Sequence, residues 1–274
     1  MKHTRLALVA ALLALVVPSL SHAAEAKPIR PGGDIIGGGP AAPGEFPFMA
    51  ALLYEPAGGS DFNKQFCGGS LIAADWVLTA AHCVEDTAAN QLAVAVGRRL
   101  LNSTEGQRRN VSAVFVHPRY GSPTANAHDA ALLRLSSPVT GITPIVLAGP
   151  NDEALETANR MLTVIGWGTT RAGKPSYPNE LHKVDVPVVS DATCQGAYRA
   201  SLDPATEVCA GAPGSDSCYG DSGGPLFANS TTDIQVGIVS WGNGCGKKRF
   251  PGVYAEVNNP NIRGWITTTT AGTV

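Results

Sequence analysis

The chain has 274 residues, of which 44% are hydrophobic and only 15% are charged, and its formal net charge is −2. This length is sufficient for one large domain or two ordinary domains with a substantial buried core. The balance of charges gives no reason to expect nucleic acid or an anionic membrane as a partner. With 31 glycines and 20 prolines, the composition favours many short strands joined by turns over long helices.

The first 23 residues are typical of a secretory signal peptide. Lys2 and Arg5 form a basic start, residues 6–17 form an apolar run, and Ser21-His22-Ala23 resembles a cleavage site of small residues. The run is shorter than the roughly 20 residues that a membrane-spanning helix needs, so we expect a secreted, extracellular protein without a membrane anchor. Residues 24–34, rich in Pro and Gly, are interpreted as a propeptide. Without this leader's four basic and two acidic residues, 16 basic and 20 acidic residues remain, a net charge near −4.

The rest of the chain indicates an all-β protein. In the first half, the predicted strands cover residues 66–72, 76–80, 92–96 and 111–116. Residues 149–160 are polar and rich in turn formers, which favours a connection between two halves. In the second half, strands are predicted over residues 161–167, 183–188, 234–241 and 252–257. Residues 260–270 predict a closing helix, although threonines at its end are poor helix formers.

The six cysteines are expected to form disulfides, because an exported protein folds in an oxidising compartment. Six cysteines allow 15 connectivities, and their spacing alone does not choose among them. A zinc site is disfavoured because the sequence has no Cys-x-x-Cys pair and no paired-histidine spacing.

Three interpretations apply to Ser222, which lies in the segment Gly220-Asp221-Ser222-Gly223-Gly224-Pro225. The segment is either a glycine-rich turn, the nucleophile elbow of an α/β-hydrolase, or the nucleophile segment of a serine protease. In the elbow the catalytic partners follow the serine. Here His82, at the end of an apolar stretch, and Asp129, before the apolar run 130–133, both precede it. Taken alone, His82 reads as a structural histidine and Asp129 as a helix cap or turn.

Together, Thr79-Ala80-Ala81-His82-Cys83, His128-Asp129-Ala130-Ala131-Leu132-Leu133 and the Ser222 segment resemble the trypsin/chymotrypsin family of serine endopeptidases. The resemblance runs from about Ile35 to the C-terminus. It implies two six-stranded antiparallel β-barrels with the active site between them, over residues 35–150 and 151–274, the second ending in a short helix. It also implies three disulfides, which are Cys67–Cys83, Cys194–Cys209 and Cys218–Cys245.

The resemblance assigns the catalytic roles as well. Ser222 is the nucleophile of an acyl-enzyme mechanism, and His82 is the general base, oriented by Asp129. Ser240 is expected to donate a further hydrogen bond to Asp129. The backbone N–H groups of Gly220 and Ser222 are expected to form the oxyanion hole, with glycine at 220 permitting the backbone conformation that this requires.

Substrate specificity is predicted from Asp216, six residues before Ser222. The residue also fits a simple turn in Gly214-Ser215-Asp216-Ser217, but the resemblance places it at the floor of the primary pocket. There a carboxylate pairs with the side chain of Arg or Lys. Glycines at 242 and 252 leave the walls open for a long side chain. The further residues that match the pocket pattern are Ser217, Ser240, Trp241, Gly242, Gly252 and Tyr254.

Activation is predicted from Ile35-Ile36-Gly37-Gly38, which resembles the N-terminus that zymogens of this family expose on cleavage. The new amine of Ile35 is expected to pair with Asp221. Asp34 stands where an autoactivating trypsin has Lys or Arg, and Arg30 precedes a proline. We therefore expect removal of the propeptide by another protease or by trimming in stages.

The expected function is that of a secreted, trypsin-like serine endopeptidase, monomeric and without cofactor. Its expected partners are protein or peptide substrates with Arg or Lys at the cleavage site, protein inhibitors and an activating protease. The alternatives are a non-catalytic protease homologue that acts as a binding module, and an esterase. No calcium is expected at residues 98–108, where arginines replace the carboxylates that calcium needs. Glycosylation sequons begin at Asn102, Asn110 and Asn229.

Overall fold

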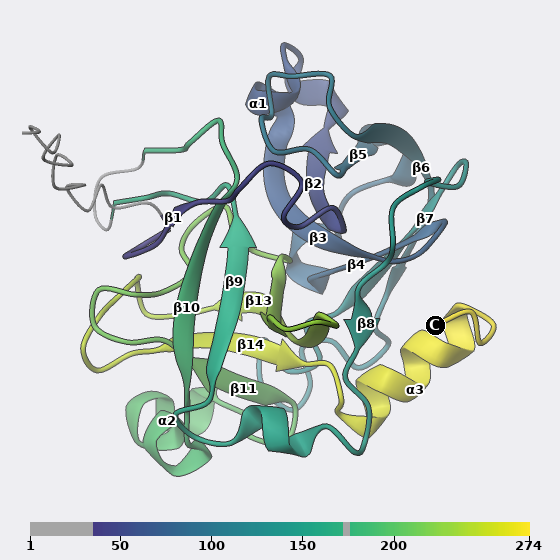
Figure 1. Cartoon of the computed structure of the whole chain (residues 1–274). Helices are drawn as coiled ribbons and strands as arrows, with labels where there is room; N and C mark the ends of the chain where they lie inside the picture. The colour runs from purple at the N-terminus through teal and green to yellow at the C-terminus, as the bar shows by residue number, and fades with distance from the viewer. Residues whose placement is uncertain (1–34, 172–175) are drawn as a thin grey trace, which may run out of the picture. The chain divides into compact units, whose positions relative to one another are not determined.

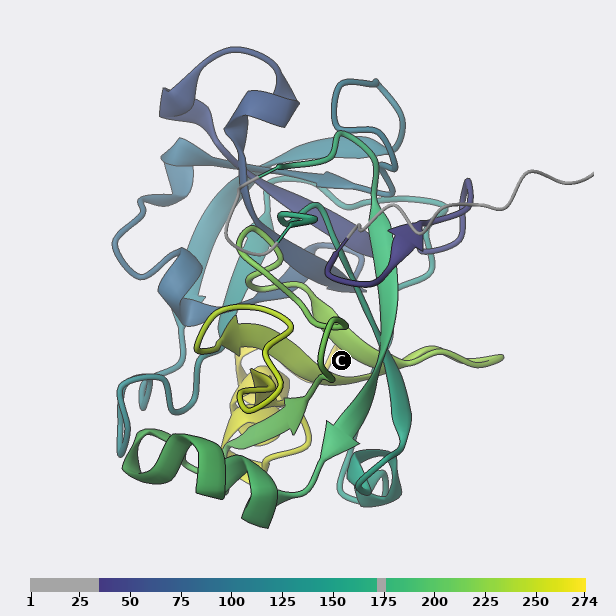
Figure 2. The same ribbon diagram turned by 90° about the vertical axis from the view of Figure 1, so that its left-hand side faces the viewer.

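The computed structural model describes residues 35–171 and 176–274. The predicted signal peptide (1–23) and propeptide (24–34) lie outside the described residues. Within them, two closed six-stranded antiparallel barrels follow each other along the chain, and they form the blue and the green-to-yellow halves (Figure 1, Figure 2). The prediction of an all-β protein with two such barrels is therefore confirmed.

The first barrel closes in the order β2-β3-β4-β7-β6-β5. Its strands are β2 (Met49–Tyr54), β3 (Gln65–Ala73), β4 (Trp76–Thr79), β5 (Leu92–Val96), β6 (Gln107–Val116) and β7 (Ala131–Leu135). Strand β5 is buried along its whole length, and small residues alternate with larger ones in its sequence Leu-Ala-Val-Ala-Val. The short helix α1 (Asp61–Lys64) and the 3₁₀ turns η1 (Glu55–Ala57), η2 (Ala81–Cys83) and η3 (Ala89–Gln91) connect these strands.

The second barrel closes in the order β9-β10-β11-β14-β13-β12, because β12 pairs with β9. Its strands are β9 (Met161–Gly166), β10 (His182–Val189), β11 (Glu207–Ala210), β12 (Pro225–Ala228), β13 (Ile234–Trp241) and β14 (Gly252–Glu256). Every second residue of β10 is buried, so Val184, Val186 and Val188 enter the core, as expected for a strand with one face inward. Two-residue strands β1 (Gly39–Pro40) and β8 (Val146–Leu147) pair with β10 and β13.

Three helical segments complete the second half, namely η4 (Glu153–Glu156), α2 (Asp191–Tyr198) with η5 (Arg199–Ser201), and the closing helix α3 (Pro260–Thr269). The side chain of Asn259 caps α3 by accepting hydrogen bonds from the N–H groups of Asn261 and Ile262. Ile262 and Ile266 are buried against the core. This packing and the Asn259 cap explain a helix where propensity alone is weak. The predicted helix is confirmed.

Eight of the twelve barrel strands were predicted to within a few residues, and β5 and β13 were predicted with their observed ends. The predictions missed β2, β11 and β12 as well as helix α2, and they included β7 only as an apolar run. Two of these strands have four residues, too few for a periodic pattern. Helix α2 contains a glycine at 196 and two threonine or cysteine residues, which weakens its helical signal.

The two barrels meet along an apolar junction. Phe227 of β12 contacts Phe46 and Phe48, which precede β2, with edge-on ring centroids 5.4 and 5.5 Å apart. The hydroxyl of Ser70 in β3 donates to Gln235 Oε1 in β13 at 2.6 Å, and both residues are buried. These contacts fix the ends of strands from both barrels relative to one another.

The three disulfides join Cys67 to Cys83, Cys194 to Cys209 and Cys218 to Cys245, the pairs that the resemblance implies. No cysteine remains free among the described residues. In the same part of the chain, none of the helices combines the length and apolar character that crossing a bilayer requires.

Candidate active site

His82 lies in the 3₁₀ turn η2, directly after strand β4, and is held by Asp129. The backbone N–H of His82 donates to Asp129 Oδ1 at 2.9 Å, and His82 Nδ1 lies 2.7 Å from Asp129 Oδ2. A buried carboxylate only accepts hydrogen bonds, so Nδ1 carries the proton and Nε2 keeps its lone pair. Burial lowers the pKa of His82, but the hydrogen bond and charge of Asp129 outweigh it and raise the pKa above 6.5. The imidazole is thus prepared to accept a proton at Nε2.

Asp129 is fully buried and accepts a third hydrogen bond from the hydroxyl of Ser240. Ser240 reaches it because the pairing of β13 with β14 shifts register between Val239 and Trp241. The bulged residue is Ser240, and its side chain leaves the regular alternation of the strand. Three donors therefore satisfy a carboxylate that would otherwise be costly to bury.

Ser222 lies where the two barrels meet and is hydrogen-bonded to the first barrel through its backbone. Its carbonyl accepts a hydrogen bond from the N–H of Gly68 in β3 at 2.7 Å. Gly68 follows Cys67, whose disulfide partner Cys83 follows His82. A Cβ at Gly223 would lie 2.2 Å from Thr79 Oγ1, just before the His82 turn. Hydrogen-bonded and covalent connections thus tie the Ser222 segment to the turn that carries the histidine.

Gly220 begins the turn that presents Ser222. Its φ is +97°, in a region that disfavours other residues, and its carbonyl accepts from Gln65 Nε2 at 3.2 Å. The turn is closed by hydrogen bonds from Asp221 N to Cys218 O and from Gly224 N to Asp221 O. Among the described residues, neither the N–H of Gly220 nor that of Ser222 donates to a protein group. Both donors remain available to a ligand.

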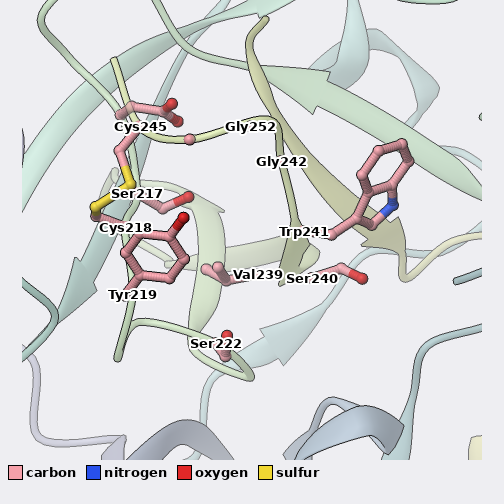
Figure 3. A pocket seen from close by; sticks show the side chains of 12 residues that line it. Ser217, Cys218, Tyr219, Ser222, Val239, Ser240, Trp241, Gly242, Cys245 and Gly252 are labelled. Atoms are coloured by element: carbon pink, nitrogen blue, oxygen red, sulfur yellow. A yellow bond between two sulfur atoms is a disulfide. The ribbon is translucent and has the colours of Figure 1, made fainter. Parts of the chain in front are cut away.

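A cavity of about 260 Å³ opens beside Ser222. Figure 3 shows Ser217, Tyr219 and the Cys218–Cys245 disulfide on one side and the end of β13, Val239 to Trp241, on the other. At Gly252, a Cβ would lie 2.7 Å from Asp216 Oδ1. The absence of a side chain there leaves space beside the carboxylate in the cavity wall.

Asp216 is one of the residues that line this cavity, and it is only 1% exposed. Its Oδ2 accepts from Gly246 N at 2.9 Å, whereas Oδ1 is buried without a hydrogen bond of normal geometry. Burial raises the pKa of Asp216 to about 7, although backbone N–H groups oppose the shift. An unpaired carboxylate oxygen on a residue that lines a cavity is an anchoring point for a cationic or hydrogen-bond-donating group.

The segment that begins at Ile35 is packed against this pocket. Ile35 is fully buried in the core of the second barrel, and the carbonyl of Ile36 accepts from Asp216 N at 3.0 Å. Gly37 has a φ of +82°, and a Cβ there would lie 2.1 Å from the carbonyl oxygen of Gly214. The position of Ile35–Gly37 is therefore coupled directly to the backbone of residues 214–216.

Asp221, the predicted partner of the Ile35 amine, is completely buried. Its two oxygens accept from Gly168 N at 2.8 Å and Cys218 N at 2.9 Å. Burial raises the pKa of Asp221 to about 7 despite these hydrogen bonds. In the uncleaved chain Ile35 has an amide nitrogen and not an amine, so the ion pair stays a prediction.

The remaining predicted sites are exposed or paired. In residues 98–108, Arg98 pairs with Asp61, and Arg108 with Glu55 and Asp61. Asn102, Asn110 and Asn229 are exposed. Among the described residues, the only His, Cys, Asp and Glu atoms grouped closely enough for a metal belong to Cys67, His82 and Cys83. Both sulfurs are in a disulfide, so they cannot act as thiolate ligands.

Sequence reasoning missed several residues that support the site. Gln65 and Gly68 hold the Ser222 turn from the first barrel, and Gly168 leaves space for Asp221, where a Cβ would lie 2.4 Å from a carboxylate oxygen. Glu207 bonds the indole of Trp241. These contacts depend on the packing of the two barrels, and no local pattern in the sequence indicates them.

Comparisons with known proteins agree on one family. The family model described as Trypsin matches residues 35–266. A trypsin-like protease of Streptomyces glaucescens is 39% identical over 91% of this chain and 87% of its own length. A trypsin of Saccharopolyspora erythraea is 40% identical over 81% of this chain and 93% of its own length, and a trypsin of Sus scrofa 34% identical over 86% and 96%.

Proposed function

The chain belongs to the trypsin family of serine endopeptidases, and from that premise we propose that it cleaves proteins after Arg and Lys, with Ser222, His82 and Asp129 as its catalytic triad. The observation that carries the proposed specificity is the buried, unpaired Oδ1 of Asp216, a residue that lines the cavity beside Ser222. The guanidinium of Arg or the ammonium of Lys supplies the missing donors.

In the proposed mechanism, the hydroxyl of Ser222 attacks the carbonyl carbon of the substrate while His82 Nε2 takes its proton. Asp129 keeps the imidazole in the required tautomer and stabilises its charged form. The N–H groups of Gly220 and Ser222 donate to the oxyanion of the tetrahedral intermediate. His82 then protonates the leaving amine, and a water molecule hydrolyses the acyl-enzyme by the same steps in reverse.

The proposed selectivity follows from the cost of a buried charge. A cationic side chain pairs with Asp216, whereas a neutral apolar side chain leaves the carboxylate desolvated and unpaired, at a cost of several kcal/mol. The open walls at Gly242 and Gly252 admit the long side chains of Arg and Lys.

Two experiments on the mature protein test this proposal. Titration with a covalent serine reagent should modify one serine, Ser222, in each chain. A peptide library should then show cleavage after Arg and Lys. A profile dominated by Phe, Leu or Ala would overturn the assignment of Asp216, and an unreactive Ser222 would overturn the triad.

Secretion and activation belong to the same proposal. Residues 1–23 direct export, and removal of residues 24–34 exposes the amine of Ile35, which pairs with Asp221. The burial of Ile35 and the hydrogen bond from Asp216 N to Ile36 O support this coupling. N-terminal sequencing of the secreted protein should give a chain that begins at Ile35.

A further inference from the structure

Trp241 forms one wall of the substrate cavity, and a carboxylate outside the cavity holds its indole ring. Trp241 Nε1 donates to Glu207 Oε1 at 2.6 Å. The ring also meets Tyr198 edge-on, with centroids 4.7 Å apart. The hydroxyl of Tyr198 in turn donates to Pro251 O at 2.5 Å. In Figure 3 the indole lies on the side of the cavity opposite Tyr219.

Burying the carboxylate of Glu207 at this position costs folding free energy. Glu207 is the first residue of β11, only 2% exposed, and its second oxygen accepts from Asp203 N at 2.6 Å. Burial raises the pKa of Glu207 to about 7, and its hydrogen bonds oppose the shift. Four further carboxylates (Glu153, Glu156, Asp191 and Glu256) and no basic side chain line the neighbouring cavity of about 330 Å³.

Among the described residues, no salt bridge involves Glu207. Its two hydrogen bonds therefore offset the free-energy cost of burying its charge. Each oxygen of this carboxylate accepts one N–H hydrogen bond, and no cation is paired with it. The carboxylate therefore fixes the orientation of the two N–H groups that donate to it. One of these groups is the indole N–H of a cavity residue.

The end of β13 links this contact to the catalytic residues. At the register shift, Ser240 turns toward Asp129 and Trp241 turns toward Glu207. Two adjacent residues of one strand are therefore held by two different buried carboxylates. Asp129 fixes the segment at the proposed triad, and Glu207 fixes it at the wall of the proposed substrate pocket.

We propose that Glu207 is a positioning residue for substrate binding, which acts through the indole N–H of Trp241 and holds this wall of the cavity in the orientation that binds peptides. The inference rests on the proposed assignment of the cavity as the substrate pocket. It concerns binding before chemistry, so the effect belongs to KM and leaves kcat nearly unchanged.

The test compares KM and kcat for the wild-type protein and for E207M, E207Q, W241F and E207M/W241F, with the peptide that the wild type cleaves fastest. E207M keeps the length of the side chain without an acceptor, and we expect KM to rise about tenfold, since one buried N–H loses its partner. E207Q keeps one strong acceptor, and its KM should lie between the KM of the wild type and that of E207M. W241F removes the N–H donor but keeps an aromatic ring.

In the double variant, KM should not exceed that of W241F, because both substitutions remove the same interaction. E256M is the matched control, since Glu256 lines the neighbouring acidic cavity and is not among the residues of the substrate cavity. It should leave KM unchanged. Titration of Ser222 with a covalent reagent confirms that each variant is folded.

Two results overturn different parts of the argument. If W241F raises KM while E207M and E207Q match the wild type, Glu207 has no positioning role, and the proposed pocket stands. If W241F itself leaves KM unchanged, the indole N–H does not position this wall and the inference is wrong. Cleavage of Arg peptides by D216S at the wild-type rate would instead show that the cavity is not the substrate pocket. Multiplicative effects of E207M and W241F would show that Glu207 acts by a route other than the indole.

Discussion

The buried aspartates near the cavity differ between the two halves of the molecule in the groups that donate hydrogen bonds to them. Asp129, between β6 and β7 of the first barrel, accepts three hydrogen bonds, two from His82 and one from Ser240. Asp216 and Asp221, in the second half, have only backbone donors, and one oxygen of Asp216 has none of normal geometry. Burial raises the pKa of both to about 7.

This difference indicates which parts of the site are complete in the uncleaved chain. Asp129 and the Nδ1 side of His82 have their hydrogen-bond partners inside the protein. The second half contains two carboxylates whose proposed partners, a substrate cation and the amine of Ile35, arrive later. In the proposed scheme, the first half supplies a general base that is already oriented. The carboxylates of the second half gain their partners only when the propeptide is cleaved and when the substrate binds.

The largest effect tests whether the two halves act as one catalytic unit. S222A and H82A should each lower kcat about 10⁶-fold, because the hydroxyl and the base are useless without each other. The double variant should be no slower than either single variant. Single-turnover and steady-state kinetics on the mature protein measure this. A double variant slower by the product of both effects would mean that His82 does not serve Ser222.

The unpaired oxygen of Asp216 gives the next largest effect. D216S should lower kcat/KM for Arg and Lys peptides about 10⁴-fold, the discrimination expected where a site loses its matched polar partner. Reaction of Ser222 with a covalent reagent should persist, since the triad is untouched. If Arg peptides are cleaved at nearly the wild-type rate, Asp216 has a structural role and does not bind the substrate cation.

Asp221 tests whether the second half is completed by cleavage. In mature chains that begin at Ile35, D221N should reduce kcat by about 10² to 10³, comparable to the loss of an oxyanion-hole donor. Wild-type chains that retain Asp34 should show a similar loss, because they lack the amine. Kinetics on the two processed forms give the comparison. Equal activity with and without Asp34 would remove the insertion mechanism.

Local patterns in the sequence were sufficient to predict an all-β protein. The two barrels and the residues of the proposed triad and pocket were predicted from the resemblance of short segments to a known family. Ser222, His82 and Asp216 lie in short segments with a recognisable composition. The role of Glu207 could not be predicted, because its contact with Trp241 depends on the register of β11 against β14 and on the shift in β13. In the same way, the hydrogen bond from Gly68 to Ser222 joins residues 154 positions apart in different barrels, and no pattern in either segment indicates the other.

The smallest expected effect is a difference in how buried groups of the two halves change stability with pH. It is measured on uncleaved S222A protein. The pKa of Asp221 is raised from 3.8 to about 7 in the folded state, so its stabilisation is complete below pH 3.8 and is lost as the pH rises through 7. The pKa of His117, at the end of β6, is lowered by burial from 6.5 to about 4. Its stabilisation is present above pH 6.5 and is lost as the pH falls through 4, which is the opposite slope.

Replacing Asp221 by Asn in this background removes its own falling contribution and leaves those of His117 and of the other buried carboxyls, Asp216 and Glu207 among them. The free energy of unfolding at pH 7.5, relative to that at pH 5, should therefore increase by about 2 kcal/mol over the parent, since one buried carboxylate no longer has to ionise. Urea unfolding at the two pH values measures the difference. D185N, at an exposed aspartate of β10, is the control. If D221N and D185N give the same value, Asp221 is already paired in the uncleaved chain, and the second half does not wait for the amine of Ile35.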